Sequence, residues 1–209
     1  MTDASTQPAS TQPANPSASP SASQPAADLP AVRESLRRLI VDNAVIRGRV
    51  TLASGREADH YVDLRRITLA ADAAPLVGRV MLDLVADLEI EAVGGLTLGA
   101  DPVATAMLHA ASAQGRRLDA FVVRKQGKAH GLQRRIEGPG VSGRRVLAVE
   151  DTSTTGGSVL TAVEALREAG ARVVAVAVVA DRDTGAREQV ERAGLEYRYA
   201  YDPADLELV

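Results

Sequence analysis

Residues 146–158 read VLAVEDTSTTGGS, and this stretch indicates both the fold and the site. The apolar run 146–149 is typical of a strand buried on both faces, as in a parallel sheet. Two acids, Glu150 and Asp151, end the run, and a loop of small residues then enters a helix predicted at about 157–169. Backbone N–H groups in such a loop, together with the helix dipole, form an anion site suited to a phosphate monoester.

The two acids make the predicted ligand more specific. They would repel a phosphate unless they hold something else, such as sugar hydroxyls or a metal ion, so the combination suggests a ribose phosphate. The stretch lacks the Gly-Lys-Ser/Thr of a Walker loop and the glycine spacing of a dinucleotide site. An ordinary strand-to-helix turn capped by Ser or Thr is the alternative, although paired acids at a buried strand end are costly without a purpose.

Apolar runs alternate with amphipathic stretches on both sides of this motif. The strands that we expect in this part of the chain are 92–97, 120–124, 145–149, 173–180 and 197–201. The helices expected between them start at Asp101-Pro102, at about 157 and at about 184. Earlier in the chain we expect helices after Asp28 and Asp72, with short strands at 50–52 and 60–64. This order predicts an α/β fold with a central parallel sheet covered on both faces, whose ligand lies beyond the carboxyl ends of the strands.

The first 27 residues differ from the rest in composition. Pro, Ala, Ser, Thr and Gln make up all of 1–27 except Met1, Asp3 and Asn15, which predicts a disordered tail. This tail has neither the basic start and apolar stretch of a secretory signal nor the arginines of a transit peptide. We therefore expect one folded domain at 28–209.

Composition excludes several classes of function. The chain has 24 Lys and Arg against 27 Asp and Glu, a net charge of −3, which argues against a general nucleic-acid binder. The absence of cysteine excludes a disulfide scaffold, a thiolate zinc site and a cysteine nucleophile. No apolar run approaches the roughly 18 residues of a membrane span. The sequence thus predicts a globular protein of the cytoplasm.

The two lysines of the chain lie three positions apart. All other basic residues are arginine, and Lys125 and Lys128 fall in the basic stretch 124–135, which holds no acid. Five glycines between 127 and 143 would let this stretch move. A mobile cationic lid suits a highly anionic leaving group such as pyrophosphate. A solvated basic loop is the alternative.

Residues 146–158 resemble the phosphoribosyl-pyrophosphate signature of type I phosphoribosyltransferases. The segments RKQGKAHG at 124–131, LASGR at 52–56 and Asp181-Arg182 narrow the resemblance to the orotate-specific members of this family, in the form found in actinobacteria. The resemblance covers nearly all of 30–205. It implies a central parallel sheet flanked by helices, a small hood subdomain (about 45–70 with 195–209) and a mobile lid (about 125–143).

The resemblance also implies a reaction and a set of residues. The 5-phosphoribosyl group would pass from phosphoribosyl pyrophosphate to orotate, giving orotidine 5′-monophosphate and pyrophosphate in pyrimidine biosynthesis. The implied catalytic residues are Lys128, His130 and Asp151. The implied contacts of phosphoribosyl pyrophosphate are Arg124, Lys125, Lys128, His130, Glu150, Asp151, Thr152, Ser153, Thr154, Thr155, Gly156, Gly157 and Ser158. The resemblance also implies a homodimer, and Mg²⁺ bound through substrate and water with no direct protein ligand.

Recognition of the base is assigned to residues on two further segments. The planar fork of Arg182 could take the carboxylate of a planar substrate in a bidentate pair, and the resemblance assigns Arg182 and Thr154 to orotate. A surface ion pair of Arg182 with Asp181 or Asp183 is the alternative. Residues Ser54, Gly55, Arg56 and Tyr61 resemble the part of the hood that covers the base.

The segment 94–99 could offer backbone N–H groups to pyrophosphate, or be a plain tight turn. Here Leu98-Gly99 stands where many relatives have Tyr-Lys, and Ala53 stands where many have lysine, so two cationic contacts are missing. We expect His60 and His109 to be structural.

Two rival functions stay open at this stage. A phosphoribosyltransferase for another base would share the signature but should need neither Arg182 nor the hood segment. A non-catalytic nucleotide-sensing regulator on the same fold would be expected to carry a basic nucleic-acid-binding face, which the neutral charge balance does not favour.

Overall fold

The computed structural model describes residues 28–51, 57–126 and 135–209. The expected tail at 1–27 and the segment 52–56 of the expected hood lie outside the described residues, as does 127–134 of the expected lid. No helix in the described part of the chain is both long enough and apolar enough to cross a membrane.

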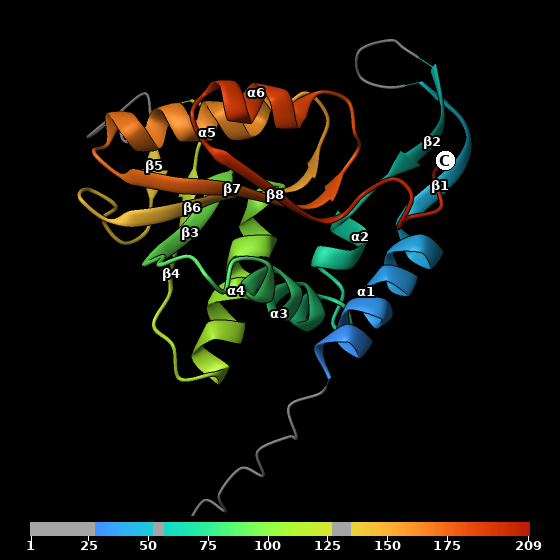
Figure 1. Ribbon diagram of the computed structural model, residues 1–209, viewed down its shortest axis with the longest axis horizontal. Helices are drawn as coiled ribbons and strands as arrows, with labels where there is room; N and C mark the ends of the chain where they lie inside the picture. The colour runs from blue at the N-terminus through green and yellow to red at the C-terminus, as the bar shows by residue number, and fades with distance from the viewer. Residues whose placement is uncertain (1–27, 52–56, 127–134) are drawn as a thin grey trace, which may run out of the picture.

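A six-stranded sheet forms the centre of the molecule, with the strand order β5-β4-β3-β6-β7-β8 (Figure 1). Its strands are β3 (Ala92–Leu96), β4 (Asp119–Val123), β5 (Ile136–Glu137), β6 (Arg145–Ser153), β7 (Arg172–Asp181) and β8 (Glu196–Tyr201). All neighbouring pairs are parallel except β4 and the two-residue edge strand β5, which are antiparallel. The predicted central parallel sheet is therefore confirmed, and β5 is an addition to it.

Helices cover both faces of this sheet, as the sequence predicts. They are α1 (Leu29–Asn43), α2 (Arg65–Thr68), α3 (Ala74–Leu84), α4 (Ala100–Ala113), α5 (Gly157–Glu168) and α6 (Ala186–Arg192). Figure 1 shows α3 and α4 on one face and α5 and α6 on the other. Alternate residues of β6 serve the two cores, since Leu147 packs in the cluster with α3 and α4, and Val146 in the cluster with α5.

Several elements differ from their predicted bounds. Strand β6 continues through both acids to Ser153, because its pairing with β7 extends to the register Ser153↔Asp181. The predicted helix after Asp72 ends at Leu84, short of Leu88. Helix α2 was not predicted, since a single turn of four residues carries no periodic pattern.

A separate two-stranded sheet lies beside the main body. Strands β1 (Val45–Thr51) and β2 (Glu57–Val62) pair antiparallel, so both short strands expected here exist, although β1 begins five residues earlier than predicted. The pairing is irregular between Arg47 and Val50, where Gly48 has a φ of 121°.

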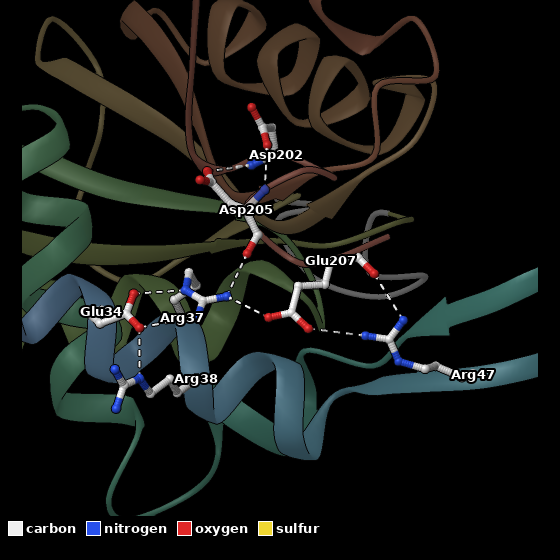
Figure 2. Close-up of polar contacts among 7 residues, drawn as sticks. All are labelled: Glu34, Arg37, Arg38, Arg47, Asp202, Asp205 and Glu207. Atoms are coloured by element: carbon white, nitrogen blue, oxygen red, sulfur yellow. Dashed lines mark hydrogen bonds and ion pairs between the residues drawn. The ribbon is translucent and has the colours of Figure 1, made fainter. Parts of the chain in front are cut away.

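The C-terminal segment 202–209 returns to α1 and the hairpin. Figure 2 shows Arg37, which donates to the carbonyl oxygen of Asp205 at 3.0 Å and to the Glu207 carboxylate at 3.2 Å. Arg47 of β1 donates to the carbonyl oxygen of Glu207 at 3.0 Å, and Leu206 is fully buried. The strand β8 belongs to the main sheet, although its end also contacts α1, where the Tyr201 hydroxyl donates to the carbonyl oxygen of Arg33 at 2.7 Å. The hood itself stays a prediction.

Candidate active site

The carboxyl ends of β3, β4, β6 and β7 meet at one edge of the sheet because these strands are parallel. Glu150 and Asp151 lie near the end of β6, and Arg182 directly follows β7. Arg124 directly follows β4. The fold therefore brings four predicted site residues to the edge where α/β folds bind their ligands.

The loop after β6 has the features of an anion site. Thr154, Thr155 and Ser158 are exposed. Gly156 has a φ of 78°, a left-handed conformation that favours glycine, and α5 begins directly after it. Among the described residues, no side chain caps the N-terminus of α5. The alternative of a Ser- or Thr-capped turn therefore loses support, and the N-terminal N–H groups of α5 have no side-chain acceptor.

Burial and mutual repulsion set the charge of the acid pair. Glu150 is only 7% exposed, and burial, followed by the charge of Asp151, raises its pKa to about 8. Burial also raises the pKa of Asp151. Hydrogen bonds from Thr152 oppose this second rise, the shortest being from its N–H to Asp151 Oδ1 at 2.6 Å. The positive charge of Arg65 and a hydrogen bond with Glu150 oppose it as well. Near neutral pH a proton is therefore held mainly on Glu150.

The segment 97–99 lies directly against the acid pair. A Cβ atom added at Gly99 would overlap Glu150 Oε1 and lie 2.7 Å from Asp151 Oδ1. A third carboxyl group, Asp101, accepts a hydrogen bond from Thr97 Oγ1 at 2.6 Å, and burial raises its pKa. Contacts between this segment and pyrophosphate stay a prediction. The position of the segment beside the two acids is consistent with such a contact.

The basic stretch is described only at its two ends. Arg124 is half-buried, and its guanidinium lies 3.5 Å from Glu137 Oε1. Lys125 is exposed. Lys128 and His130 lie outside the described residues. In the second half of the expected lid, β5 pairs with β4.

The predicted orotate residues lie on adjacent strand ends. The Arg182 N–H donates to the carbonyl oxygen of Ser153 at 3.1 Å, which sets Arg182 beside the start of the phosphate loop. Thr184 Oγ1 donates to the carbonyl oxygen of Thr154 at 2.7 Å and joins the two segments again. Within the described residues Arg182 makes no ion pair with Asp181 or Asp183. The alternative of a surface ion pair therefore has no support in the described part of the chain.

Sequence reasoning missed Arg65, the first residue of α2. Its charge acts on Asp151. No motif marks it, and its neighbour Arg66 looks the same in the sequence. Sequence reasoning also expected His109 to be structural, yet its side chain lies exposed on α4.

The fold and the site together define a type I phosphoribosyltransferase, and the family model described as "Phosphoribosyl transferase domain" matches residues 79–194. The orotate phosphoribosyltransferase of Streptomyces avermitilis is 70% identical over 178 residues, 85% of this chain and 98% of that protein. The protein of the same name from Mycobacterium tuberculosis H37Rv is 60% identical over 176 residues, 84% of this chain and 97% of its own. The chain belongs to the orotate phosphoribosyltransferase family.

Solved structures agree with this assignment. The orotate phosphoribosyltransferase of Mycobacterium tuberculosis H37Rv in complex with 5-phospho-alpha-D-ribosyl 1-diphosphate superposes with a TM-score of 0.75 at 54% identity. The match covers 85% of this chain and 99% of that one. A phosphoribosyltransferase from Corynebacterium diphtheriae gives a TM-score of 0.76 at 55% identity, over 85% and 99% of the two chains.

Proposed function

We propose that this chain transfers the 5-phosphoribosyl group of phosphoribosyl pyrophosphate to orotate, giving orotidine 5′-monophosphate and pyrophosphate. The observation that carries the proposal is the set of groups at the carboxyl ends of β6 and β7. These groups are the acids Glu150 and Asp151, the N-terminus of α5 and the guanidinium of Arg182. These groups match, in turn, the ribose hydroxyls, the 5′-phosphate and the carboxylate of a planar base.

In the reaction the bond from ribose C1 to the diphosphate oxygen breaks, and the diphosphate leaves with the electron pair. A bond from C1 to a ring nitrogen of orotate forms. Positive charge builds on the ribose ring between these events, and the carboxylates of Glu150 and Asp151 stabilise it. That charge also favours the ionised form of Glu150, whose pKa of about 8 in the empty site leaves it ready to lose its proton. Once orotate is ionised, the ring nitrogen needs no general base.

The donor groups of the site fit Mg²⁺ bound through the substrate. Among the described residues no group of three or more His, Asp or Glu side chains could hold a metal ion. Mg²⁺ keeps several waters and takes phosphate oxygens readily, so it needs no protein cage. When bound to the diphosphate it would neutralise charge on the leaving group, while Glu150 and Asp151 hold the ribose hydroxyls.

The test is orotate consumption, followed by absorbance, with phosphoribosyl pyrophosphate and Mg²⁺ present. Consumption that stops when the metal is chelated supports the proposal. If the folded protein consumes no orotate but uses another base, the substrate is wrong. Inactivity with every base would contradict a catalytic function and favour a nucleotide-sensing regulator.

The lid carries a separate prediction. We propose that Lys128 and His130 bind the departing diphosphate, with Arg124 and Lys125 at the base of the lid. Replacing Lys128 with Ala should cost turnover heavily, by about 100-fold, because a charge-assisted contact made in the transition state is lost. Thermal unfolding should change little. Unchanged turnover in this variant would exclude the lid assignment.

We also propose that the protein acts as a homodimer, through the face of α3 and α4. A cavity of about 930 Å³ lies on this face, lined mainly by apolar side chains of α2, α3 and α4. Leu69 and Leu98 line it and are 72% and 70% exposed. Exposed apolar side chains around an apolar hollow are typical of a surface that another protein covers. A second copy of this chain is the partner that we propose, because the resemblance to orotate phosphoribosyltransferases implies a homodimer. The cytoplasmic location stays a prediction.

A further inference from the structure

On the side of the segment 97–99, the described residues of the site present acidic groups and, within this segment, no cation. The segment 97–99 borders the acid pair, yet it carries no basic side chain. Gly99 leaves no room for one in this arrangement, because a Cβ there would overlap Glu150 Oε1. A diphosphate that binds along this segment would face Glu150 and Asp151 and, behind them, Asp101. A positive group from another element would therefore stabilise a diphosphate at this face, in addition to Mg²⁺ and the lid.

Arg65 lies on the element that faces this segment. It borders the same cavity as Leu98 and Asp101, so α2 and the segment 97–99 share one surface. Its charge lowers the pKa of Asp151, which places the guanidinium within electrostatic reach of the acid pair. The other groups that act on Arg65 are Asp63 and Tyr61, both on its own side of the site.

The backbone and one hydrogen bond hold Arg65 in place. Its Nε donates to Asp63 Oδ1 at 3.0 Å, and the Asp63 N–H donates to the carbonyl oxygen of Ala44 at 2.9 Å. One edge of the guanidinium is thus fixed to the end of β2. The side chain is 50% exposed in the single chain, so part of the guanidinium is accessible there, at the border of the face that the proposed dimer would cover. A guanidinium that is hydrogen-bonded along one edge and exposed along the other is suited to bind a phosphate group.

We infer that Arg65 is a further substrate-binding residue, which contacts the diphosphate of phosphoribosyl pyrophosphate across the segment 97–99. In the empty site it offsets the charge of Asp151, and on binding it turns to the more highly charged diphosphate. This inference rests on the proposed function. It adds a cation from α2 to those expected from the lid.

Arg66 provides a matched control for the test. It is the next residue, it is also exposed, and its guanidinium donates to the carbonyl oxygen of Asn43, away from the acid pair. The variants are Arg65→Gln, Arg65→Lys and Arg66→Gln. The measurements are the Kd of magnesium pyrophosphate by calorimetry, the KM of each substrate, and the thermal midpoint.

We expect Arg65→Gln to weaken pyrophosphate binding and to raise the KM of phosphoribosyl pyrophosphate by about 10- to 100-fold, because a charge-assisted contact is lost. The KM of orotate should change little. Arg65→Lys should recover part of the affinity, because it keeps the charge and loses the fork. Arg66→Gln should match the wild type.

Three outcomes would overturn the inference. One is an unchanged pyrophosphate Kd in Arg65→Gln. Another is a lowered thermal midpoint in Arg65→Gln, with the KM values of both substrates raised equally. Asp63→Asn would show the same pattern if Arg65 only anchors α2. If Arg65→Gln does not fold, the neutral variant Arg65→Met takes its place, and wild-type pyrophosphate affinity in that variant overturns the inference. A wild-type protein that consumes no orotate rejects the proposed function instead.

Discussion

At the scale of single residues, the acid pair shows how a functional site lowers the stability of the fold. A carboxyl group with a pKa of about 8 binds its proton more tightly in the folded chain than in the unfolded one, where the value is near 4.5. Its stabilising contribution is therefore complete below pH 4.5 and is lost as the pH rises toward 8. The raised pKa of Asp151 acts in the same direction.

Replacing Glu150 with Gln should remove most of this pH dependence. We expect the wild type to lose stability on the order of a few kcal/mol between pH 5 and pH 8.5, and Glu150→Gln to lose much less. At pH 8.5 the variant should unfold at the higher temperature, although its kcat/KM falls because the amide is a weaker acceptor for a ribose hydroxyl. Thermal unfolding at the two pH values checks this. Equal pH dependence in both proteins would contradict the assigned pKa.

Arg182 is the residue on which base recognition depends. Replacing it with Lys removes the planar fork but keeps the charge, so the KM of orotate should rise by about 10-fold or more. The KM of phosphoribosyl pyrophosphate should stay within about twofold, because other residues bind that substrate. Arg192→Lys on the exposed side of α6 is the control, since Arg192 bonds only to the carbonyl oxygen of Glu188 in the described structure. Steady-state kinetics that show equal rises in both KM values would reject the assignment.

At the scale of elements, the sequence predicts what is periodic and misses what is local. The buried runs of β6 and β7 are unmistakable, yet the end of β6 was placed at Val149 because two acids rarely continue a buried strand. Pairing with β7 carries the strand four residues further. Arg65 escaped notice because α2 has a single turn and its opposing charge, Asp151, lies 86 positions away in the sequence. Two charges that come together only in the folded chain leave no spacing pattern in the sequence.

The contact between α3 and α4 gives a prediction of its own. A Cβ at Gly78 would overlap the carbonyl oxygen of Ala106 and lie 2.6 Å from its carbon. Alanine normally favours a helix over glycine by about 1 kcal/mol, whereas overpacking costs about 1–3 kcal/mol. Both contacts here are to backbone atoms, which cannot swing away, so Gly78→Ala should destabilise the protein.

Ser112→Ala serves as the control for Gly78→Ala. Ser112 is exposed on α4, so its replacement brings the helix preference without the clash. We expect Ser112→Ala to unfold at or slightly above the wild-type temperature. Gly78→Ala should unfold a few degrees lower, about 2–4 °C for each kcal/mol lost. A Gly78→Ala midpoint at or above that of Ser112→Ala would contradict the close approach of the two helices.

At the scale of the whole molecule, the apolar cavity and the proposed active site lie on different surfaces that share a border. The cavity of about 930 Å³ on α3 and α4 reaches Leu98 and Asp101, which adjoin the acid pair through the segment 97–99. A partner seated on this face would thus cover the side of the site from which diphosphate leaves. Association and catalysis should therefore be linked.

Leu69→Glu tests that link. Leu69 lines the cavity and is 72% exposed, so a charge there costs the free chain little but must be desolvated in a dimer. We expect the wild type to sediment as a dimer and Leu69→Glu to weaken association by about 100-fold or more, equivalent to about 3 kcal/mol. Val209→Glu is the matched control, because Val209 is 95% exposed at the C-terminus and outside this cavity. That variant should remain dimeric.

The specific activity of Leu69→Glu should fall on dilution in step with its dissociation. A dimer that survives Leu69→Glu unchanged places the interface elsewhere, and a monomer with full activity shows that each site is complete within one chain.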